Sequence, residues 1–124
     1  MEVFLNNLRL KLEKKLTTDI LNPDNECILW TGSKNSDGYG ILNVKWIDGA
    51  RKQCRAHRLA YMIYYNTVDL GPQPQMEVSH ICHVKNCLNP KHLVLEPHYI
   101  NMSRQSCRHT GECLKMHTPF CMLR

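Results

Sequence analysis

Cysteine and histidine gather in two short stretches of this chain, at spacings that suit metal binding. Cys82, Cys87 and His92 follow one another at intervals of five residues, and the turn signal Asn89-Pro90 falls between the last two. Structural zinc takes four ligands from Cys thiolates and His nitrogens. A turn at Asn89-Pro90 would fold this segment back, so that three ligands converge on one ion. A second group of residues of the same kind lies within the last eighteen residues: Cys107, Cys113, His117 and Cys121.

Residues on either side of the first stretch could take part in the hydrolysis of a phosphodiester. His80 lies two residues before Cys82, where a neutral imidazole can act as a general base near pH 7. Asn101 follows twenty-one residues after His80, and its amide oxygen is a hard ligand suited to Mg²⁺. A base, a metal ligand and nearby cations form a coherent set for phosphodiester hydrolysis. The competing interpretation is that each residue, taken alone, is structural.

Length and composition favour a small intracellular protein that metal helps to hold together. The chain has 124 residues, with seven Cys and seven His, and aromatic residues make up 7% of it. A hydrophobic core of this size stabilises a fold only modestly. A disulfide framework is the alternative, but the Cys count is odd and the charged, amphipathic N-terminus does not read as a secretory signal. No run approaches the roughly 20 apolar residues of a membrane span. We therefore expect an intracellular, reduced protein, nuclear if its source is eukaryotic.

The N-terminal half predicts a helix followed by a β-hairpin region. Leucines at helical spacing predict an amphipathic helix over residues 3–16, within an N-terminal segment of residues 1–20. A β region for DNA contact is expected over residues 27–56, beginning with a β segment at residues 27–30. Asp48-Gly49 is a strong hairpin signal. The strands that it would join are residues 41–46 and residues 50–55.

The C-terminal half predicts a strand, a metal loop, a second strand and a helix. Residues 57–65 indicate a largely buried helix before this unit. The ββα unit spans residues 76–106, with its first strand ending on His80 and Pro97 at the start of its helix. A zinc loop over residues 107–121 completes the chain. Together these patterns predict one α+β domain over residues 1–124.

These motifs resemble those of the ββα-metal (His-Me finger, HNH-like) nucleases. The resemblance rests on Ser79-His80-Ile81-Cys82-His83, on Cys87-Leu88-Asn89-Pro90-Lys91-His92-Leu93 and on Asn101. Within this group, the chain is most similar to the zinc-bound His-Cys box homing endonucleases. The segment Arg55-Ala56-His57-Arg58-Leu59-Ala60-Tyr61 also resembles the helix that precedes the motif in phage HNH proteins. The resemblance covers roughly residues 27 to 121.

The resemblance implies a Mg²⁺-dependent DNA endonuclease on a small, zinc-stabilised ββα-metal fold. His80 would be the general base that activates water, and Asn101 the single protein ligand of one catalytic Mg²⁺. Hydrolysis would leave 5′-phosphate and 3′-hydroxyl ends. The family's phosphate-clamping arginine follows the hairpin turn; Arg51 matches best there, and Lys52 stays an alternative.

Two structural zinc ions are implied as well. The first would use Cys27, Cys82, Cys87 and His92, and the second Cys107, Cys113, His117 and Cys121. Two alternatives stay open at this point. Cys54 competes with Cys27 as the fourth ligand of the first zinc. His109 competes with His117, because the second group is spaced differently from that of the family.

Double-stranded DNA is the partner that this interpretation predicts. The formal charge is +5, and six zinc-bound thiolates opposed by two dications would lower it to about +3. A mildly basic protein fits nucleic acid through a localised patch. The hairpin offers such a patch as a cationic β-ribbon suited to a major groove. Its residues are Lys45, Arg51, Lys52 and Arg55.

Two other function classes compete with the nuclease. A catalytically inactive, zinc-stabilised DNA-binding module would keep the fold and lose cutting, but intact His80 and Asn101 argue against this loss. A RING-type protein-interaction module is disfavoured, because its C-x2-C ligand pairs are absent. The sequence ends at Arg124 without the C-terminal arm that dimerises the family's enzyme. A homodimer, including one formed through the N-terminal helix, and a monomer that nicks DNA are therefore both open.

Overall fold

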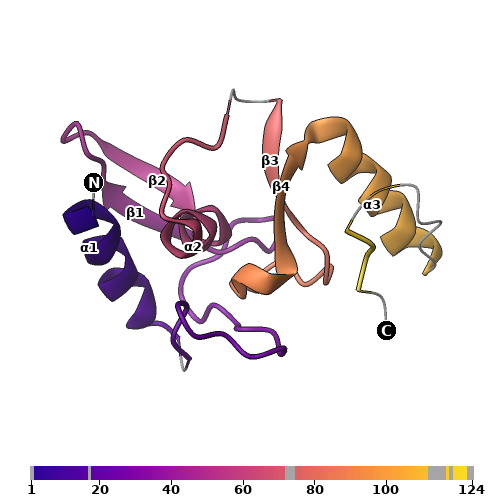
Figure 1. Cartoon of the computed structure of the whole chain (residues 1–124), viewed down its shortest axis with the longest axis horizontal. Helices are drawn as coiled ribbons and strands as arrows, with labels where there is room; N and C mark the ends of the chain where they lie inside the picture. Colours follow the sequence, from indigo (N-terminus) through magenta and orange to yellow (C-terminus); the bar gives the residue numbers. More distant parts are fainter. Residues whose placement is uncertain (1, 17, 72–74, 112–116, 118, 123–124) are drawn as a thin grey trace.

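Two antiparallel hairpins and three α-helices make up the part of the chain that the structure describes (Figure 1). This computed structural model describes residues 2–16, 18–71, 75–111, 117 and 119–122. The elements, in order, are α1 (Glu2–Glu13), β1 (Ile41–Lys45), β2 (Arg51–Arg55), α2 (Ala56–Tyr65), β3 (Met76–His80), the 3-10 helix η1 (Pro90–His92), β4 (Leu93–Pro97) and α3 (His98–Thr110). The predicted α+β class is thereby confirmed.

Helix α2 lies at the centre of the molecule, between the N-terminal elements and the β3–β4 hairpin (Figure 1). It contacts α1, β2, β3 and η1. Its buried residues include Leu59, Ala60, Met62 and Ile63, which belong to the hydrophobic core. The helix predicted at residues 57–65 is therefore confirmed, and it forms the surface on which the other elements pack.

Helix α1 packs on α2 through one row of leucines. Leu5, Leu8 and Leu12 are buried, at the i, i+3, i+7 spacing of a single helix face. The helix ends at Glu13, three residues before the predicted end at residue 16. In the residues that follow, the Lys15 and Leu16 amides donate backbone hydrogen bonds to carbonyls three positions earlier. Such bonds tighten the last turn of a helix.

The β1–β2 hairpin forms where the sequence predicts it. Lys45 pairs with Arg51 beside the turn, and Ile41 pairs with Arg55 at the other end. Gly49 in the turn has a φ of +89°, which favours glycine, and Asp48 Oδ1 accepts a hydrogen bond from the Ala50 amide at 2.9 Å.

The β segment predicted at residues 27–30 is wrong as a strand. Leu29 makes a single β-bridge with Cys87, supported by backbone bonds of 2.9 Å from Trp30 to Asn86 and 2.7 Å from Leu88 to Ile28. The pairing stops there because the partner segment turns at Asn89 and enters η1 at Pro90, which has no N–H to donate.

The ββα unit follows the predicted order. In the β3–β4 hairpin, His80 pairs with Leu93, so the histidine stands at the end of the hairpin where the Cys-containing loop begins. Helix α3 packs on both strands and begins after Pro97. It runs to Thr110, four residues beyond the predicted end, and stops where Gly111 adopts a φ of +77°.

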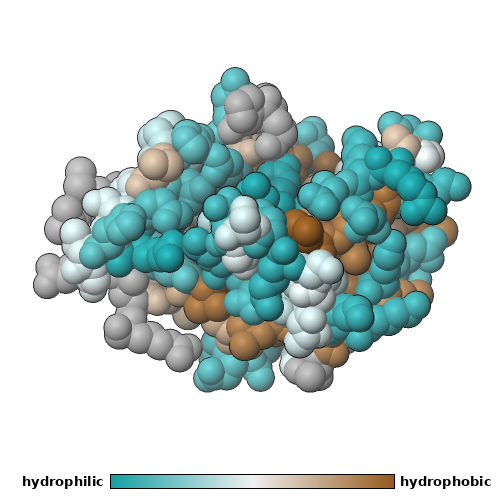
Figure 2. All heavy atoms as spheres, turned by 180° about the vertical axis from the view of Figure 1, so that it is seen from behind, coloured by the Kyte–Doolittle hydropathy of each residue, from teal (hydrophilic) through white to brown (hydrophobic). Residues whose placement is uncertain are grey.

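Hydrophilic residues cover most of the face seen from behind, with smaller hydrophobic patches between them (Figure 2). No helix among the described residues is long and apolar enough to cross a membrane.

The leucine row of α1 predicts a sharp contrast between two neighbouring positions. Leu12 is 0% exposed, whereas Leu10 on the opposite face is 51% exposed. Leu12→Ala should destabilise the protein by about 2–5 kcal/mol, because it leaves a cavity in the core. Leu10→Ala should change stability by no more than about 0.5 kcal/mol. Urea unfolding of both variants measures the difference, and equal losses would contradict this packing.

Candidate functional site

Four side chains from distant parts of the chain converge on one point below β3. The ligand atoms of Cys27, Cys82, Cys87 and His92 all lie within 4.8 Å of one another. His92 Nδ1 is 3.5 Å from the sulfurs of Cys27 and Cys87. Cys54 lies outside this cluster and lines a separate cavity. Three thiols and one imidazole are the donor set of a structural zinc site.

The second nitrogen of His92 fixes the ring in the orientation that metal binding needs. His92 Nε2 donates to the Asn25 carbonyl at 2.9 Å, so Nδ1 keeps its lone pair for the cluster. The thiols are crowded: a hydrogen bond with Cys87 lowers the pKa of Cys82, and the same contact raises the pKa of Cys87. A bound dication would relieve this competition by deprotonating the thiols.

Asn89 brings the strand-like segment that carries Cys27 to the loop. Its side-chain amide donates to the carbonyls of Asp24 and Glu26 at 2.8 and 2.6 Å, and its oxygen accepts from the Lys91 amide at 2.9 Å. Asn89 is completely buried. These hydrogen bonds join residues 65 and 63 positions apart and hold the Cys27 segment against the loop that carries Cys87 and His92.

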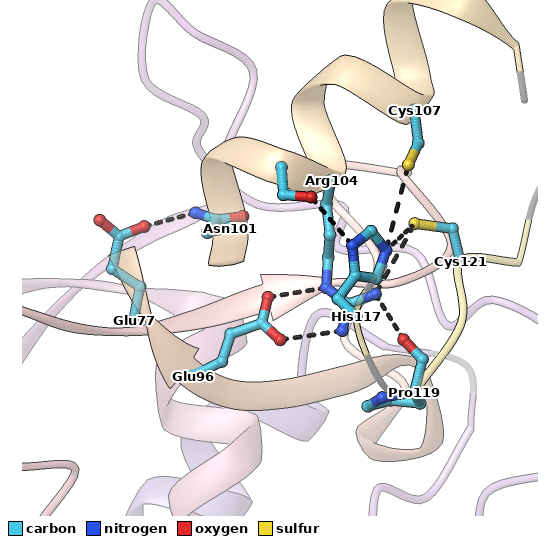
Figure 3. A network of polar contacts seen from close by, with 9 residues as sticks. Glu77, Glu96, Asn101, Arg104, Cys107, His117, Pro119 and Cys121 are labelled. Atoms are coloured by element: carbon cyan, nitrogen blue, oxygen red, sulfur yellow. Dashed lines mark hydrogen bonds and ion pairs between the residues drawn. The ribbon is translucent and has the colours of Figure 1, made fainter. Parts of the chain in front are cut away.

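A second cluster lies at the far end of α3. Cys107, His117 and Cys121 bring their ligand atoms together, with His117 Nε2 at 3.2 Å from the Cys121 sulfur (Figure 3). Ser103 Oγ is 3.1 Å from the other ring nitrogen of His117, which leaves Nε2 facing the sulfurs. His109 is exposed on α3, outside this cluster. The predicted fourth ligand, Cys113, lies outside the described residues.

A buried ion pair ties this end of α3 to β4. Arg104 is 0% exposed and donates to both carboxylate oxygens of Glu96, at 2.7 and 2.9 Å (Figure 3). It also donates to the Pro119 carbonyl at 2.7 Å and lies 3.6 Å from the Cys121 sulfur. Sequence reasoning did not single out Arg104, because a charged residue inside an amphipathic helix pattern usually faces solvent.

His80 and Asn101 line one cavity of about 430 Å³ between the hairpin half and the ββα half. His80 is buried at the end of β3, and its Nε2 donates to the Cys87 carbonyl at 3.0 Å. This bond leaves Nδ1 as the nitrogen that can take a proton. Burial lowers the pKa of His80 to about 4, so the ring is neutral near pH 7.

The walls of the cavity are strongly cationic. Four basic side chains line it: Arg55, Arg58, Lys85 and Arg108. The residues predicted as phosphate clamp are not among those that line it. Arg51 and Lys52 lie toward the hairpin turn, and four residue steps along the extended strand place Arg51 roughly 13 Å from Arg55. Lys45 pairs with Arg51 across the hairpin and lines a separate groove beside α1.

Three rings in mutual contact, those of Tyr39, His57 and the candidate base His80, form part of the cavity wall. His57 lies 4.4 Å from His80 between ring centroids, and Tyr39 lies 5.9 Å from His80. Burial lowers the pKa of His57 well below its usual value. The sequence predicted a largely buried helix beginning at His57 but gave this residue no role; its place beside His80 follows from packing, which spacing does not reveal.

Buried polar atoms without a hydrogen-bond partner gather at the same place. In the described part of the chain they are His57 Nδ1, Ser79 Oγ and His83 Nε2, and all three residues line the cavity. Buried polar groups are normally paired, so such a cluster marks a place where water or a ligand completes the bonding. The left-handed backbone of His83, with a φ of +59°, adds a second local irregularity.

The β3–β4 hairpin, the helix packed on it and the Cys/His clusters able to bind zinc are consistent with a His-Me finger fold. A family model described as the zinc-binding loop region of homing endonuclease matches residues 26–123. The chain belongs to that family.

Among curated proteins, Protein 7.7 of Escherichia phage T7 is 43% identical over 70 residues, which are 56% of this chain and 47% of that protein. The chain therefore matches about half the length of this relative. No solved structure matches the chain.

The geometry of the first cluster predicts different results for two cysteines. Cys87→Ser should lower the zinc content by one ion per chain and unfold the ββα unit, because structural zinc binding is coupled to folding. Cys54→Ser is the matched control and should keep the zinc content of the wild type. Mass spectrometry under native conditions counts the ions, and circular dichroism reports the fold. Equal zinc content in the wild type and Cys87→Ser would contradict the assignment.

Proposed function

We propose that this protein is a Mg²⁺-dependent DNA endonuclease that hydrolyses phosphodiesters to 5′-phosphate and 3′-hydroxyl ends. One observation carries the proposal: His80 and Asn101 line the same cavity, and four cationic side chains share it with them. A general base, a hard oxygen ligand and fixed positive charge are the parts that phosphodiester hydrolysis requires. The family to which the chain belongs supports this activity.

His80 would act as the general base. Its Nε2 is held by the Cys87 carbonyl, and a neutral ring can accept a proton on Nδ1. In the proposed reaction, the oxygen of a water molecule bonds to phosphorus as the bond to the 3′ oxygen breaks. The water proton passes to His80, and the 3′ oxygen takes a proton from solvent.

Asn101 would hold the catalytic cation. Its side-chain amide supplies an oxygen at the cavity wall, and the Glu77 carboxylate lies beside it. Oxygen donors of this kind suit Mg²⁺, which keeps several waters and takes few protein ligands. When bound, Mg²⁺ supplies positive charge that stabilises the scissile phosphate and the leaving oxygen.

Arg55 and Arg58 are our candidates for the phosphate clamp, in place of Arg51 or Lys52. Both residues line the cavity, and the Arg55 guanidinium lies over the Tyr39 ring, 5.2 Å from its centroid. Arg51, Gln53 and Arg55 alternate along β2, so they share one face of the hairpin. This face would guide the backbone of double-stranded DNA from the hairpin turn toward His80.

The two Cys/His clusters would hold one structural zinc each and take no part in the chemistry. The first set would be Cys27, Cys82, Cys87 and His92, and the second would include Cys107, His117 and Cys121, with Cys113 as the predicted fourth ligand. Closed sets of thiolates and imidazoles are typical of structural zinc, whereas catalytic zinc keeps an open position.

A plasmid-cleavage assay tests the proposal directly. The zinc-loaded wild type should nick or linearise supercoiled DNA only when Mg²⁺ is added. His80→Ala should slow cleavage about 10²- to 10⁴-fold, the usual contribution of a general base, while zinc content stays at the wild-type value. His109→Ala, on an exposed position of α3, is the matched control and should cut like the wild type. Salt-sensitive DNA binding without cleavage, on random-sequence DNA as well, would instead favour an inactive DNA-binding module.

Two arginines on one strand should separate catalysis from binding. Arg55→Ala should lower the single-turnover cleavage rate at saturating protein, because its guanidinium lies in the cavity. Arg51→Ala should mainly weaken DNA binding and reduce the slope of log affinity against log salt by about one unit. Cleavage kinetics and fluorescence anisotropy at several salt concentrations measure the two effects. The reverse pattern would restore Arg51 as the clamp.

A further inference from the structure

Glu77 joins strand β3 to two residues of α3 at the edge of the candidate active site. One oxygen of its carboxylate accepts a hydrogen bond from His98 Nδ1. The other accepts one from Asn101 Nδ2 (Figure 3). Glu77 and Asn101 both line the cavity that contains His80. The His98 and Glu77 side chains are 58% and 27% exposed, so this contact lies near the mouth of the cavity.

The carboxylate decides which end of the Asn101 amide faces the cavity. An amide side chain has an NH₂ group that only donates and an oxygen that only accepts, and the two ends are almost the same size. An ionised carboxylate only accepts hydrogen bonds. The NH₂ group of Asn101 must therefore face Glu77, and its oxygen points away from the carboxylate.

The contact with His98 holds Glu77 itself in place. His98 is the first residue of α3, and its backbone amide donates to the Gln75 carbonyl at 2.7 Å. Its ring then reaches Glu77 on the adjacent strand. With both carboxylate oxygens already accepting hydrogen bonds, Glu77 is arranged to orient a neighbour rather than to bind an ion directly.

We propose that Glu77 is a positioning residue for the divalent cation: by binding the Asn101 NH₂ group, it presents the Asn101 oxygen as the metal ligand. The inference rests on the proposed function, in which Asn101 binds Mg²⁺. Hydrogen-bond partners of metal ligands fix the ligand orientation, and losing one typically costs about 10- to 100-fold in metal affinity or activity.

Two substitutions separate orientation from direct binding. Glu77→Gln keeps an oxygen that can accept from Asn101 but removes the charge. Glu77→Leu removes the acceptor at similar volume. A positioning role predicts that Gln retains most of the wild-type metal affinity and that Leu weakens it about tenfold or more. If Gln weakens binding as much as Leu does, the carboxylate charge itself is required and the positioning role is wrong.

Mn²⁺ serves as the probe, because its unpaired electrons broaden NMR signals close to it. The experiment titrates Mn²⁺ into zinc-loaded, ¹⁵N-labelled protein and follows the Asn101 side-chain amide signals. In the wild type, these signals should show nuclear Overhauser contacts to the Glu77 side chain before metal is added, and should broaden early in the titration. Asn101→Ala and the Leu variant should both need about tenfold more Mn²⁺ to broaden the surrounding backbone signals.

The outcomes distinguish this inference from the proposed function. If Glu77→Leu binds Mn²⁺ with the affinity of the wild type, the proposed role of Glu77 is wrong, whether or not the protein cuts DNA. Mn²⁺ bound beside Asn101 with the predicted order of variants, but without DNA cleavage, would sink the nuclease and support the positioning role. If Glu77→Leu loses its zinc or its fold, absence of the Asn101–Glu77 contacts in the wild-type spectrum still overturns the inference.

Discussion

Cys87 carries two contacts on which the rest of the site depends. Its sulfur lies in the cluster with Cys27, Cys82 and His92, and its carbonyl accepts the hydrogen bond that orients His80. The same residue also makes the β-bridge to Leu29 that brings in the N-terminal half of the chain. In a domain of this size the hydrophobic core stabilises the fold only modestly. The ion that we propose for this cluster would hold the Cys-containing loop in place. It would thereby also hold the Cys87 carbonyl and the His80 ring that donates to it.

Helix α3 is held by a row of contacts at successive turns of one face. Asn101 binds Glu77 on β3, Arg104 binds Glu96 on β4, and Cys107 enters the second cluster (Figure 3). Residues three apart lie on the same side of a helix, so the spacing of these positions aims all of them at the hairpin and the C-terminal segment. The second cluster thus steadies the helix that carries Asn101, and the first steadies the strand that carries His80. The two residues of the proposed chemistry stand on different elements, each anchored at its own Cys/His cluster.

Local signals in the sequence predicted most helices and strands. The features that they did not predict depend on tertiary packing. Asp48-Gly49 fixed the hairpin turn, and the leucine row of α1 and the strand ending on His80 lie where their patterns indicate. Residues 27–30 did not form the predicted strand, because their partner is a turning loop rather than a strand. The burial of Arg104 against Glu96 and the contact of His57 with His80 were not predicted, because both depend on tertiary contacts that sequence spacing does not report.

The cations of the cavity illustrate the same limit. A family pattern placed the phosphate clamp just after the hairpin turn, but the observed register sets Arg51 beside that turn and Arg55 at the cavity. Arg58 and Arg108 join Arg55 from α2 and α3, two helices that are far apart in the sequence. Which basic side chains share one cavity depends on how the hairpin half packs against the ββα half. Because that packing arises only in the folded chain, the sequence indicated a mildly basic protein but not the cavity in which several of its basic side chains gather.

We propose that the Cys/His clusters hold structural zinc while a different ion acts between His80 and Asn101. A crystal structure of the zinc-loaded protein with a non-cleavable DNA duplex and Mn²⁺ would distinguish the two kinds of site by anomalous maps at both metal edges. We expect zinc peaks inside the two clusters and a manganese peak between Asn101 Oδ1 and a DNA phosphate, with His80 facing that phosphate. A manganese peak away from Asn101, or zinc at the phosphate, would contradict this proposal.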